Sequence, residues 1–210
     1  HIIAKAGCRV MFAGQLESGK TTLLNSYLNL IDRRTVIMED TPELMTTNPN
    51  TIYQRTVKAG SDEAVEVTLA DLVKNFRRTY GLMPVVGEVR GPEAVELLDL
   101  FNTGFIFGAS SIHANSARDV VNQLIFQIKA SGKLGVDRKE LEEYIGRTID
   151  MIVYMEKRKV VEIVELYYDY EKEQLVFHPL HKFVIQKEST NGIDGYFIKN
   201  INPFSDKMKD

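Results

Sequence analysis

A chain of 210 residues can bury one full-sized core, and its 44% apolar and 26% charged residues are ordinary for a soluble globular protein. The formal net charge of −3 gives no basic surface of the kind that nucleic-acid-binding domains present, so we expect no direct nucleic-acid contact. The single cysteine, Cys8, leaves no internal disulfide to form, and no apolar run approaches the ~18 residues of a membrane span. We expect an intracellular protein with one main core.

The stretch from residue 14 to residue 22 reads G-x-x-x-x-G-K-T-T, which is the phosphate-binding loop pattern. The β-prone run 10–13 precedes it and the helical run 22–30 follows it, which is the context that the motif requires. The two glycines let the backbone turn so that N–H groups face phosphate oxygens, and the helix adds its positive N-terminal end. In this pattern Lys20 reaches the β- and γ-phosphates and the Thr21 hydroxyl binds Mg²⁺.

The alternative to this interpretation is a glycine-containing turn that only begins a helix. A chance match to the pattern is rare, on the order of one in a hundred for a chain of this length. We therefore predict that the chain binds a nucleoside triphosphate with Mg²⁺. The predicted nucleotide-binding residues are Gly14, Gln15, Leu16, Glu17, Ser18, Gly19, Lys20, Thr21 and Thr22.

Three further polar residues, Glu39, Glu88 and His113, each follow or end a short apolar run that is typical of a buried parallel strand. In an open α/β sheet such residues converge on the edge that carries the ligand. An acid at the tip of a strand beside a phosphate loop is where these enzymes hold Mg²⁺ and water. The alternatives are an acidic turn before Pro42 for Glu39 and a satisfied structural group for His113.

Strands and helices alternate through about residue 150, which predicts a mostly parallel sheet flanked by helices. Helices are expected over 69–80 and 92–102, and after the N-caps Ser116 and Asp137, each followed by an acid at the capping-box position. Pro84 is unusual because it removes a ladder donor from what should be a central strand.

From Met151 the apolar period changes to two, and the runs 151–156, 160–169 and 174–177 predict an antiparallel meander. Residues 187–210 are polar and are predicted to form a loosely packed tail. We divide the chain into a nucleotide-binding core over 1–150 and a β-rich extension of the same domain over 151–210. Because the first strand begins almost at residue 1 and the chain starts with His, we also expect a preceding N-terminal domain outside these residues.

Four motifs stand in order along the chain, at residues 14–22, 39–44, 86–91 and 112–116. The second reads EDTPEL, the third VGEVRG and the fourth IHANS. This series resembles the secretion ATPase superfamily of type II secretion, type IV pilus and type IV secretion motors, and is most similar to its Tad-pilus and conjugation branch. The family names these motifs Walker A, Asp box, Walker B and His box, and the resemblance covers essentially the whole chain.

The resemblance implies a RecA-like P-loop NTPase fold and a C-terminal ATPase domain that works as a homo-hexameric ring. Such rings hydrolyse ATP with Mg²⁺ to drive pilus assembly, protein secretion or conjugative transfer. It also implies inner-membrane platform proteins as partners, and a cytoplasmic location with peripheral attachment to the cytoplasmic membrane.

The resemblance carries roles to individual residues. Glu88 would assist Mg²⁺ and water, together with Thr21 on the metal, and Glu39 would position or activate the attacking water. His113 would sense the γ-phosphate, and Arg55 is the nearby candidate for the family's arginines after the Asp box. Which glutamate is the base stays open.

The sequence departs from the family pattern at several positions. The residues Gln15-Leu16-Glu17 replace a small, glycine-containing run, and Gln123 stands where an arginine is common. Arginines that contact the transition state are worth several orders of magnitude in rate. An alternative function is therefore a nucleotide-gated structural ring subunit that binds ATP but hydrolyses it poorly. A GTPase switch is disfavoured because no Asn-Lys-x-Asp motif occurs.

Overall fold

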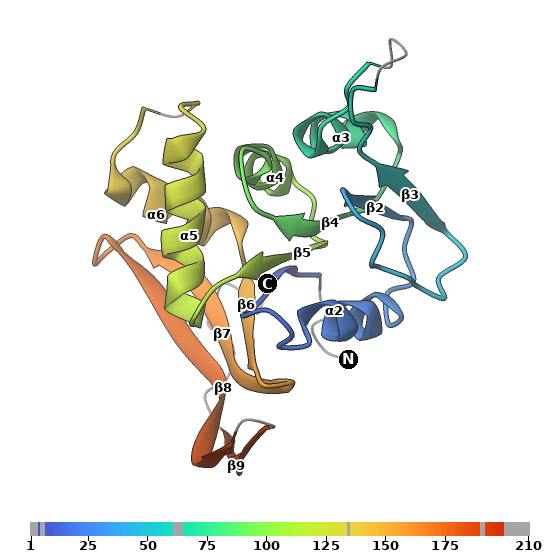
Figure 1. The fold of residues 1–210 in the computed structure, drawn as a ribbon. Coiled ribbons are helices and arrows are strands. Elements are labelled where there is room, and N and C mark those ends of the chain that lie inside the picture. The colour runs from blue at the N-terminus through green and yellow to red at the C-terminus, as the bar shows by residue number, and fades with distance from the viewer. Residues whose placement is uncertain (1–3, 5–6, 61–64, 134, 190–191, 200–210) are drawn as a thin grey trace.

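The computed structural model describes residues 4, 7–60, 65–133, 135–189 and 192–199. Within these residues the chain forms a nine-stranded sheet with the order β3-β2-β4-β5-β1-β6-β7-β8-β9, and helices pack on both faces of its parallel part (Figure 1). The first six strands in this order run parallel to one another, and the last three continue the sheet in antiparallel pairs.

The parallel strands are short and, except for the edge strand β3, mostly buried. They are β1 (Arg9–Gly14), β2 (Thr35–Glu39), β3 (Thr51–Arg55), β4 (Met83–Val89), β5 (Gly108–His113) and β6 (Met151–Glu156). Side chains alternate between the two faces with the period of a strand. In β1, Val10 and Phe12 belong to one core, whereas Met11 and Ala13 belong to the other.

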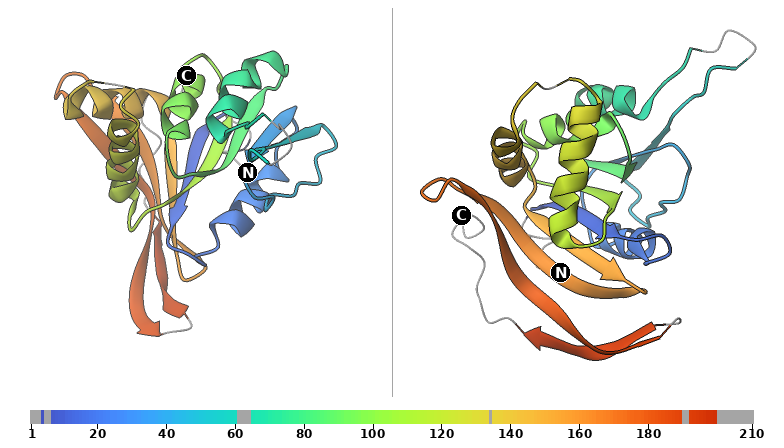
Figure 2. Two further views of the ribbon diagram at one scale, coloured as in Figure 1. Left: turned by 45° about the horizontal axis from the view of Figure 1, so that its top comes forward. Right: turned by 60° about the vertical axis from the view of Figure 1, so that its left-hand side comes forward.

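The helices that cover the sheet are α2 (Lys20–Leu28), α3 (Leu69–Asn75), α4 (Glu93–Phe101), α5 (Ala117–Ala130) and α6 (Arg138–Thr148), with the short 3₁₀ helix η1 (Phe76–Arg78). Helix α2 covers one face, and the other helices cover the opposite face (Figures 1 and 2). The helix predicted over 69–80 ends earlier, because the chain continues into η1 and then reverses at Tyr80, whose φ is 55°.

The predicted N-caps are present, with one difference in detail. Asp137 and Glu140 form the expected reciprocal capping box at α6. At α5 the Ser116 side chain accepts a hydrogen bond from the Asp119 N–H, but the Asp119 carboxylate accepts from the N–H of Asn115 rather than from that of Ser116. At α5 the second hydrogen bond of the capping box therefore comes from the residue before the N-cap instead of from the N-cap itself.

Pro84 fits its central strand because of where pairing begins. In β4 it lies opposite Val36 of β2, but the pairing of β4 with β5 starts only at Val85. A missing N–H donor at the start of a strand removes no bond from the middle of the ladder.

The antiparallel strands are β7 (Lys159–Asp169), β8 (Gln174–Ser189) and β9 (Gly192–Lys199). Strand β6 joins the two parts, since it pairs in parallel with β1 and antiparallel with β7. The antiparallel meander predicted from Met151 is confirmed, and its first strand, β6, also extends the parallel part of the sheet. The division into a core over 1–150 and an extension over 151–210 stays a prediction.

The prediction of a loosely packed tail over 187–210 is wrong for its first part. Strand β8 continues well beyond the expected 174–177, and β9 pairs with it through residue 199. The pairing supplies partners for backbone groups that a tail would leave to water, and Ile193 is buried. Residues 200–210 lie outside the described residues. The first part of β8 packs near α6, and its later part extends with β9 away from the helical layers (Figure 2).

Candidate nucleotide site

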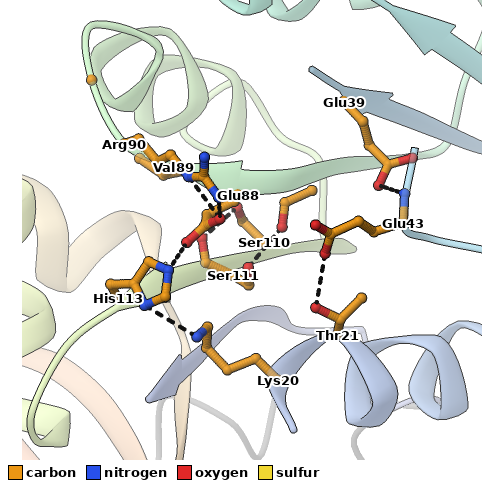
Figure 3. Close-up of polar contacts among 12 residues, drawn as sticks. Lys20, Thr21, Glu39, Glu43, Glu88, Val89, Arg90, Ser110, Ser111 and His113 are labelled. Carbon is orange, nitrogen blue, oxygen red and sulfur yellow. Dashed lines mark hydrogen bonds and ion pairs between the residues drawn. The ribbon is translucent and has the colours of Figure 1, made fainter. Parts of the chain in front are cut away.

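A cleft of about 840 Å³ opens at the carboxyl ends of the parallel strands, within the size range of ligand pockets in proteins. Residues 16–22 of the phosphate-binding loop line it, together with side chains at the ends of β4 and β5 (Figure 3). A smaller pocket adjoins it and is lined by residues at and just after the end of β2, namely Glu39, Asp40, Thr41, Glu43 and Leu44. The edge that carries the cleft is the one where parallel sheets place their ligands.

Lys20 occupies the position that the loop pattern predicts. Gly19, with a φ of 95°, is the N-cap of α2, and no acidic side chain lies in the first turn of that helix. The Lys20 ammonium donates hydrogen bonds to the carbonyl oxygens of Gly14 and Gln15 at 3.0 and 2.9 Å. Burial lowers the pKa of Lys20, and this effect is opposed by the nearby Glu88 carboxylate. The loop thus presents a desolvated cation at the start of a helix.

His113 connects the phosphate loop to the end of β4. Its Nδ1 lies 3.3 Å from Lys20 Nζ, and its Nε2 lies 2.7 Å from Glu88 Oε1 (Figure 3). An ammonium can only donate, so Nδ1 is the acceptor and Nε2–H faces Glu88. Arg90 Nε donates to the other Glu88 oxygen at 2.7 Å. The structure therefore brings Lys20, His113 and Glu88 together in one continuous polar chain.

Glu88 is positioned by an irregularity in the sheet. The register between β4 and β5 shifts between Val86 and Val89. The Ser110 hydroxyl donates to Val86 O at 2.8 Å, and the Ser111 hydroxyl donates to Gly87 O at 2.7 Å. The small polar residues of β5 thus satisfy carbonyl groups that the shifted ladder would leave unpaired.

Glu39 is almost fully buried and faces the loop that follows it. Its Oε1 accepts hydrogen bonds from the backbone N–H groups of Glu43 at 3.1 Å and Leu44 at 2.9 Å. A side chain on Gly87 would not fit here, because its Cβ would lie 2.8 Å from Glu39 Cγ. Burial raises the pKa of Glu39, and its two backbone hydrogen bonds oppose that shift.

Glu43, rather than Glu39, contacts the phosphate-binding loop. The Thr21 hydroxyl donates to Glu43 Oε2 at 3.3 Å, across the boundary between the two pockets (Figure 3). Glu39 holds the Glu43 backbone from behind. Glu39 therefore lies beside the site and fixes the loop from which Glu43 reaches Thr21.

Other predicted site residues lie at the margin. Arg55 ends β3, directly opposite Glu39 in the register, but it is exposed and lines neither pocket. The Gln15 side chain donates to Asn115 Oδ1 at 3.0 Å, so it contacts the fourth motif. Leu16 is 78% exposed, and Glu17 has a φ of 58° at the outside of the loop.

Three charged residues that line the cleft are not among the predicted site residues: Glu43, Arg90 and Arg158. Glu43 and Arg90 lie within the second and third motifs, so their place next to Glu39 and Glu88 was a usable signal. Arg158 belongs to the turn between β6 and β7, far along the chain from the loop, and nothing in the local sequence marks it.

The residues of the cleft fit a magnesium nucleotide better than a protein-only metal site. Within the described ranges, no group of three or more His, Cys, Asp and Glu side chains is arranged to hold a metal. Mg²⁺ usually takes one or two protein oxygens together with phosphate and water. The Thr21 hydroxyl with the Glu43 and Glu88 carboxylates offers that kind of partial shell.

Comparison with known proteins gives a consistent family. The sequence pattern of the family described as type II/IV secretion system protein matches residues 1–153. The probable conjugal transfer protein TrbB of Sinorhizobium fredii is 34% identical over 181 residues, covering 79% of this chain and 52% of that protein. A putative conjugal transfer protein of Mycobacterium tuberculosis is 33% identical over 172 residues, covering 78% and 48%. The chain thus spans about half the length of the curated relatives it matches.

Solved structures confirm the fold. The VirB11 ATPase of the Brucella suis type IV secretion system, solved with sulphate, superposes with a TM-score of 0.62 at 21% identity, covering 83% of this chain and 48% of that one. The pilus retraction motor PilT with bound ADP gives a TM-score of 0.56 at 18% identity, covering 85% and 49%. At these identities the likeness shows the fold alone, a mostly parallel α/β sheet with antiparallel C-terminal strands. With the sequence matches, it follows that this chain belongs to the type II/IV secretion system protein family.

Proposed function

We propose that this chain is the Mg²⁺-dependent ATPase domain of a homo-hexameric motor that powers protein secretion, pilus assembly or conjugative transfer. The observation that carries the proposal is the convergence of Lys20, Thr21, Glu43, Glu88 and His113 on one cleft. Relatives named as conjugal transfer proteins, and a like-folded motor solved with ADP, support it.

Each residue has a physical role in this proposal. Lys20 exchanges its two loop carbonyls for phosphate oxygens, which bear a full charge and make stronger hydrogen bonds. The Mg²⁺ that accompanies ATP would neutralise phosphate charge and hold water. Thr21 would offer its hydroxyl to that ion once Glu43 releases it.

The contacts favour Glu43 over Glu39 as the carboxylate that acts on the attacking water. Glu43 faces the loop, whereas one Glu39 oxygen is committed to two backbone N–H groups. Glu88 is held between His113 and Arg90, so it suits the metal and water shell and couples it to the γ-phosphate side of the loop.

The proposal of a homo-hexameric ring rests on the resemblance to the family and not on a feature of this chain. In the ring we expect the domain to work in the cytoplasm, attached peripherally to the cytoplasmic membrane through inner-membrane platform proteins. None of the described helices is both long and apolar enough to cross a membrane.

A second candidate function is a nucleotide-gated ring subunit that binds ATP but hydrolyses it poorly. One observation favours it: several polar groups of the cleft already contact one another, with Glu43 on Thr21, and Glu88 paired with both His113 and Arg90. A site that must first break these contacts on binding would turn over slowly unless the neighbouring subunit helps.

Lys20→Ala tests nucleotide binding. We expect isothermal titration to show a loss of Mg·ATP affinity of at least about tenfold in a folded protein, because the lost cation faces the phosphates. Lys129→Ala, at an exposed position of α5, is the matched control and should bind normally. Unchanged ATP affinity in folded Lys20→Ala would rule out the phosphate-loop interpretation.

Glu43→Gln tests hydrolysis. In the full-length ring we expect phosphate release to fall about 10²–10⁴-fold with little change in ATP affinity, as for loss of a general base. Glu39→Gln should have the smaller effect, because a glutamine oxygen can still accept from the Glu43 and Leu44 N–H groups. A wild-type ring that binds ATP but releases phosphate no faster than Glu43→Gln would favour the gated subunit.

A further inference from the structure

The main cleft has a second end that the phosphate chemistry leaves unexplained. Beyond Thr22 its lining includes residues of α2 on one side and of the β6–β7 hairpin on the other. Here its lining changes from charged groups to Leu23 and Ser26 of α2, and Met155 and Val160 on the other side. Leu23 and Val160 are partly buried against the same core. A flat apolar group could lie between these two walls.

The β6–β7 turn is packed directly on the phosphate loop. The Arg158 N–H donates to Ser18 O at 3.1 Å. A Cβ on Gly19 would lie 3.6 Å from Arg158 Cα and 3.3 Å from Met155 Cε. The turn therefore holds a fixed position relative to any phosphates on the loop.

The turn has an unusual backbone for its sequence. Lys157 and Arg158 have φ values of 43° and 64°, so both central residues are left-handed. Tight hairpin turns of this kind prefer asparagine and glycine, because other residues adopt positive φ at a cost in energy. Two long cationic side chains at such positions indicate a use for the side chain rather than for the turn.

Arg158 is the residue of this turn that faces the cleft. Its side chain is exposed and lines the end of the cleft beside Met155 and Val160. Among the described residues its guanidinium makes no ion pair or hydrogen bond. Lys157 lines a neighbouring pocket with Glu17 and Glu156, and Arg158 lines that pocket as well as the main cleft. The two neighbouring cations thus differ in that Arg158 reaches the main cleft and Lys157 does not line it.

We propose that this end of the cleft is the nucleobase subsite, in which the Arg158 guanidinium stacks on the purine of the nucleotide held by residues 16–22. The apolar walls exclude water from the ring, and the planar cation covers its π face. Stacking does not read the base edge, so ATP and GTP should depend on Arg158 to the same degree. This inference rests on the proposed function, because the phosphates must occupy the loop.

The test compares nucleotide with inorganic tripolyphosphate in the full-length protein, by isothermal titration in Mg²⁺. Arg158→Asn is the informative variant, since asparagine tolerates the left-handed backbone. Lys157→Asn is the matched control, with the same change at the adjacent position. We expect Arg158→Asn to weaken ATP and GTP by about tenfold and to leave tripolyphosphate unchanged. Lys157→Asn should alter none of the three.

The possible outcomes distinguish failure of the nucleobase subsite from failure of the proposed function. If Arg158→Asn weakens tripolyphosphate as much as ATP, the side chain binds phosphate and the base subsite is wrong. If it weakens neither, or if Lys157→Asn has the same effect, the proposal also fails, while the phosphate-loop function stands. If the wild-type protein binds neither ATP nor tripolyphosphate, the proposed function fails and this subsite fails with it.

Discussion

The parallel strands β2, β4, β5 and β1 and the antiparallel strands β7 to β9 belong to one sheet but bury their side chains differently. Every residue of β2 is buried, and so are the residues of β1 after Arg9. In β7 most residues outside its centre are only half-buried. Helices cover both faces of the first group, whereas the later part of β8 and β9 extend away from the helices (Figure 2).

This difference in burial explains where the strands carry charged and polar side chains. A strand that is buried on both faces has no room for charged side chains along its length, so they collect where the strands end. Glu39, Glu88 and His113 are the last or nearly last residues of their strands. The less buried antiparallel strands β7 and β8 instead carry charged and polar residues along their length.

The largest expected effect breaks the packing of the parallel half. Phe76 is fully buried and contacts Phe105 edge-on, with ring centroids 5.1 Å apart. Phe76→Ala should lower the free energy of unfolding by about 4 kcal/mol through lost burial and a cavity. Urea titration would show a lower midpoint at constant slope. Phe126→Ala, on the outside of α5 and 70% exposed, is the control. Equal losses in both would contradict this account of the core.

A slightly smaller effect is expected at the junction of the two halves. Asp150, just before β6, accepts hydrogen bonds from the Arg9 N–H at 2.9 Å and from its guanidinium at 2.7 Å. Asp150→Ala leaves that mostly buried cation without its carboxylate and should cost about 3 kcal/mol. Arg77→Ala removes the exposed pair with Asp99 and should cost no more than about 0.5 kcal/mol. A double-mutant cycle of Arg9 and Asp150 with negligible coupling would show that the pair does not fasten β1 to β6.

A smaller effect with a pH signature is expected at Glu39. Burial raises its pKa above the usual 4.5, so the folded state holds this proton more tightly than the unfolded state does. Ionisation therefore costs the folded protein stability, a cost that is absent below pH 4.5 and complete above the raised pKa. Glu39→Gln should be the more stable protein at pH 8, and the advantage should shrink toward pH 4. A variant that is less stable than the wild type at pH 8 would mean that the carboxylate charge is needed for folding.

Much of the parallel half could be predicted from the sequence. The runs around residues 10, 36, 86 and 110 are short and apolar, and those around 10, 86 and 110 are each followed directly by a helix. A βαβ series admits few topologies. The spacing of its glycines and Lys20 predicted the phosphate loop. The same regularity predicted that Glu88 and His113 lie close to Lys20, because strand ends share an edge of the sheet.

The other features of the fold and site could not be predicted, for reasons that the structure identifies. The contact of Glu43 with Thr21 could not be predicted, because it depends on how the loop after Glu39 folds back. No sequence periodicity encodes that fold. Arg158 reaches the loop through a hairpin whose left-handed turn Lys-Arg sequences do not signal. The glycines and polar residues of β9 predict a loop, whereas pairing with β8 outweighs that tendency and makes the segment a strand.

The smallest expected effect lies in the antiparallel half, at Phe197 of β9. Its ring packs on Phe183 of β8 with centroids 4.9 Å apart, but it is 49% exposed, whereas Phe183 is 5% exposed. Truncating Phe197 loses one edge-on ring contact and only part of the usual burial, so Phe197→Ala should cost about 1 kcal/mol. Phe183→Ala, on the paired strand, should cost about 3 kcal/mol, because that ring is buried and a cavity remains. Urea titrations of both variants beside Phe76→Ala would rank the three sites. If Phe197→Ala proved as costly as Phe76→Ala, the end of the sheet would be as tightly packed as its centre, and the contrast between the two halves would be wrong.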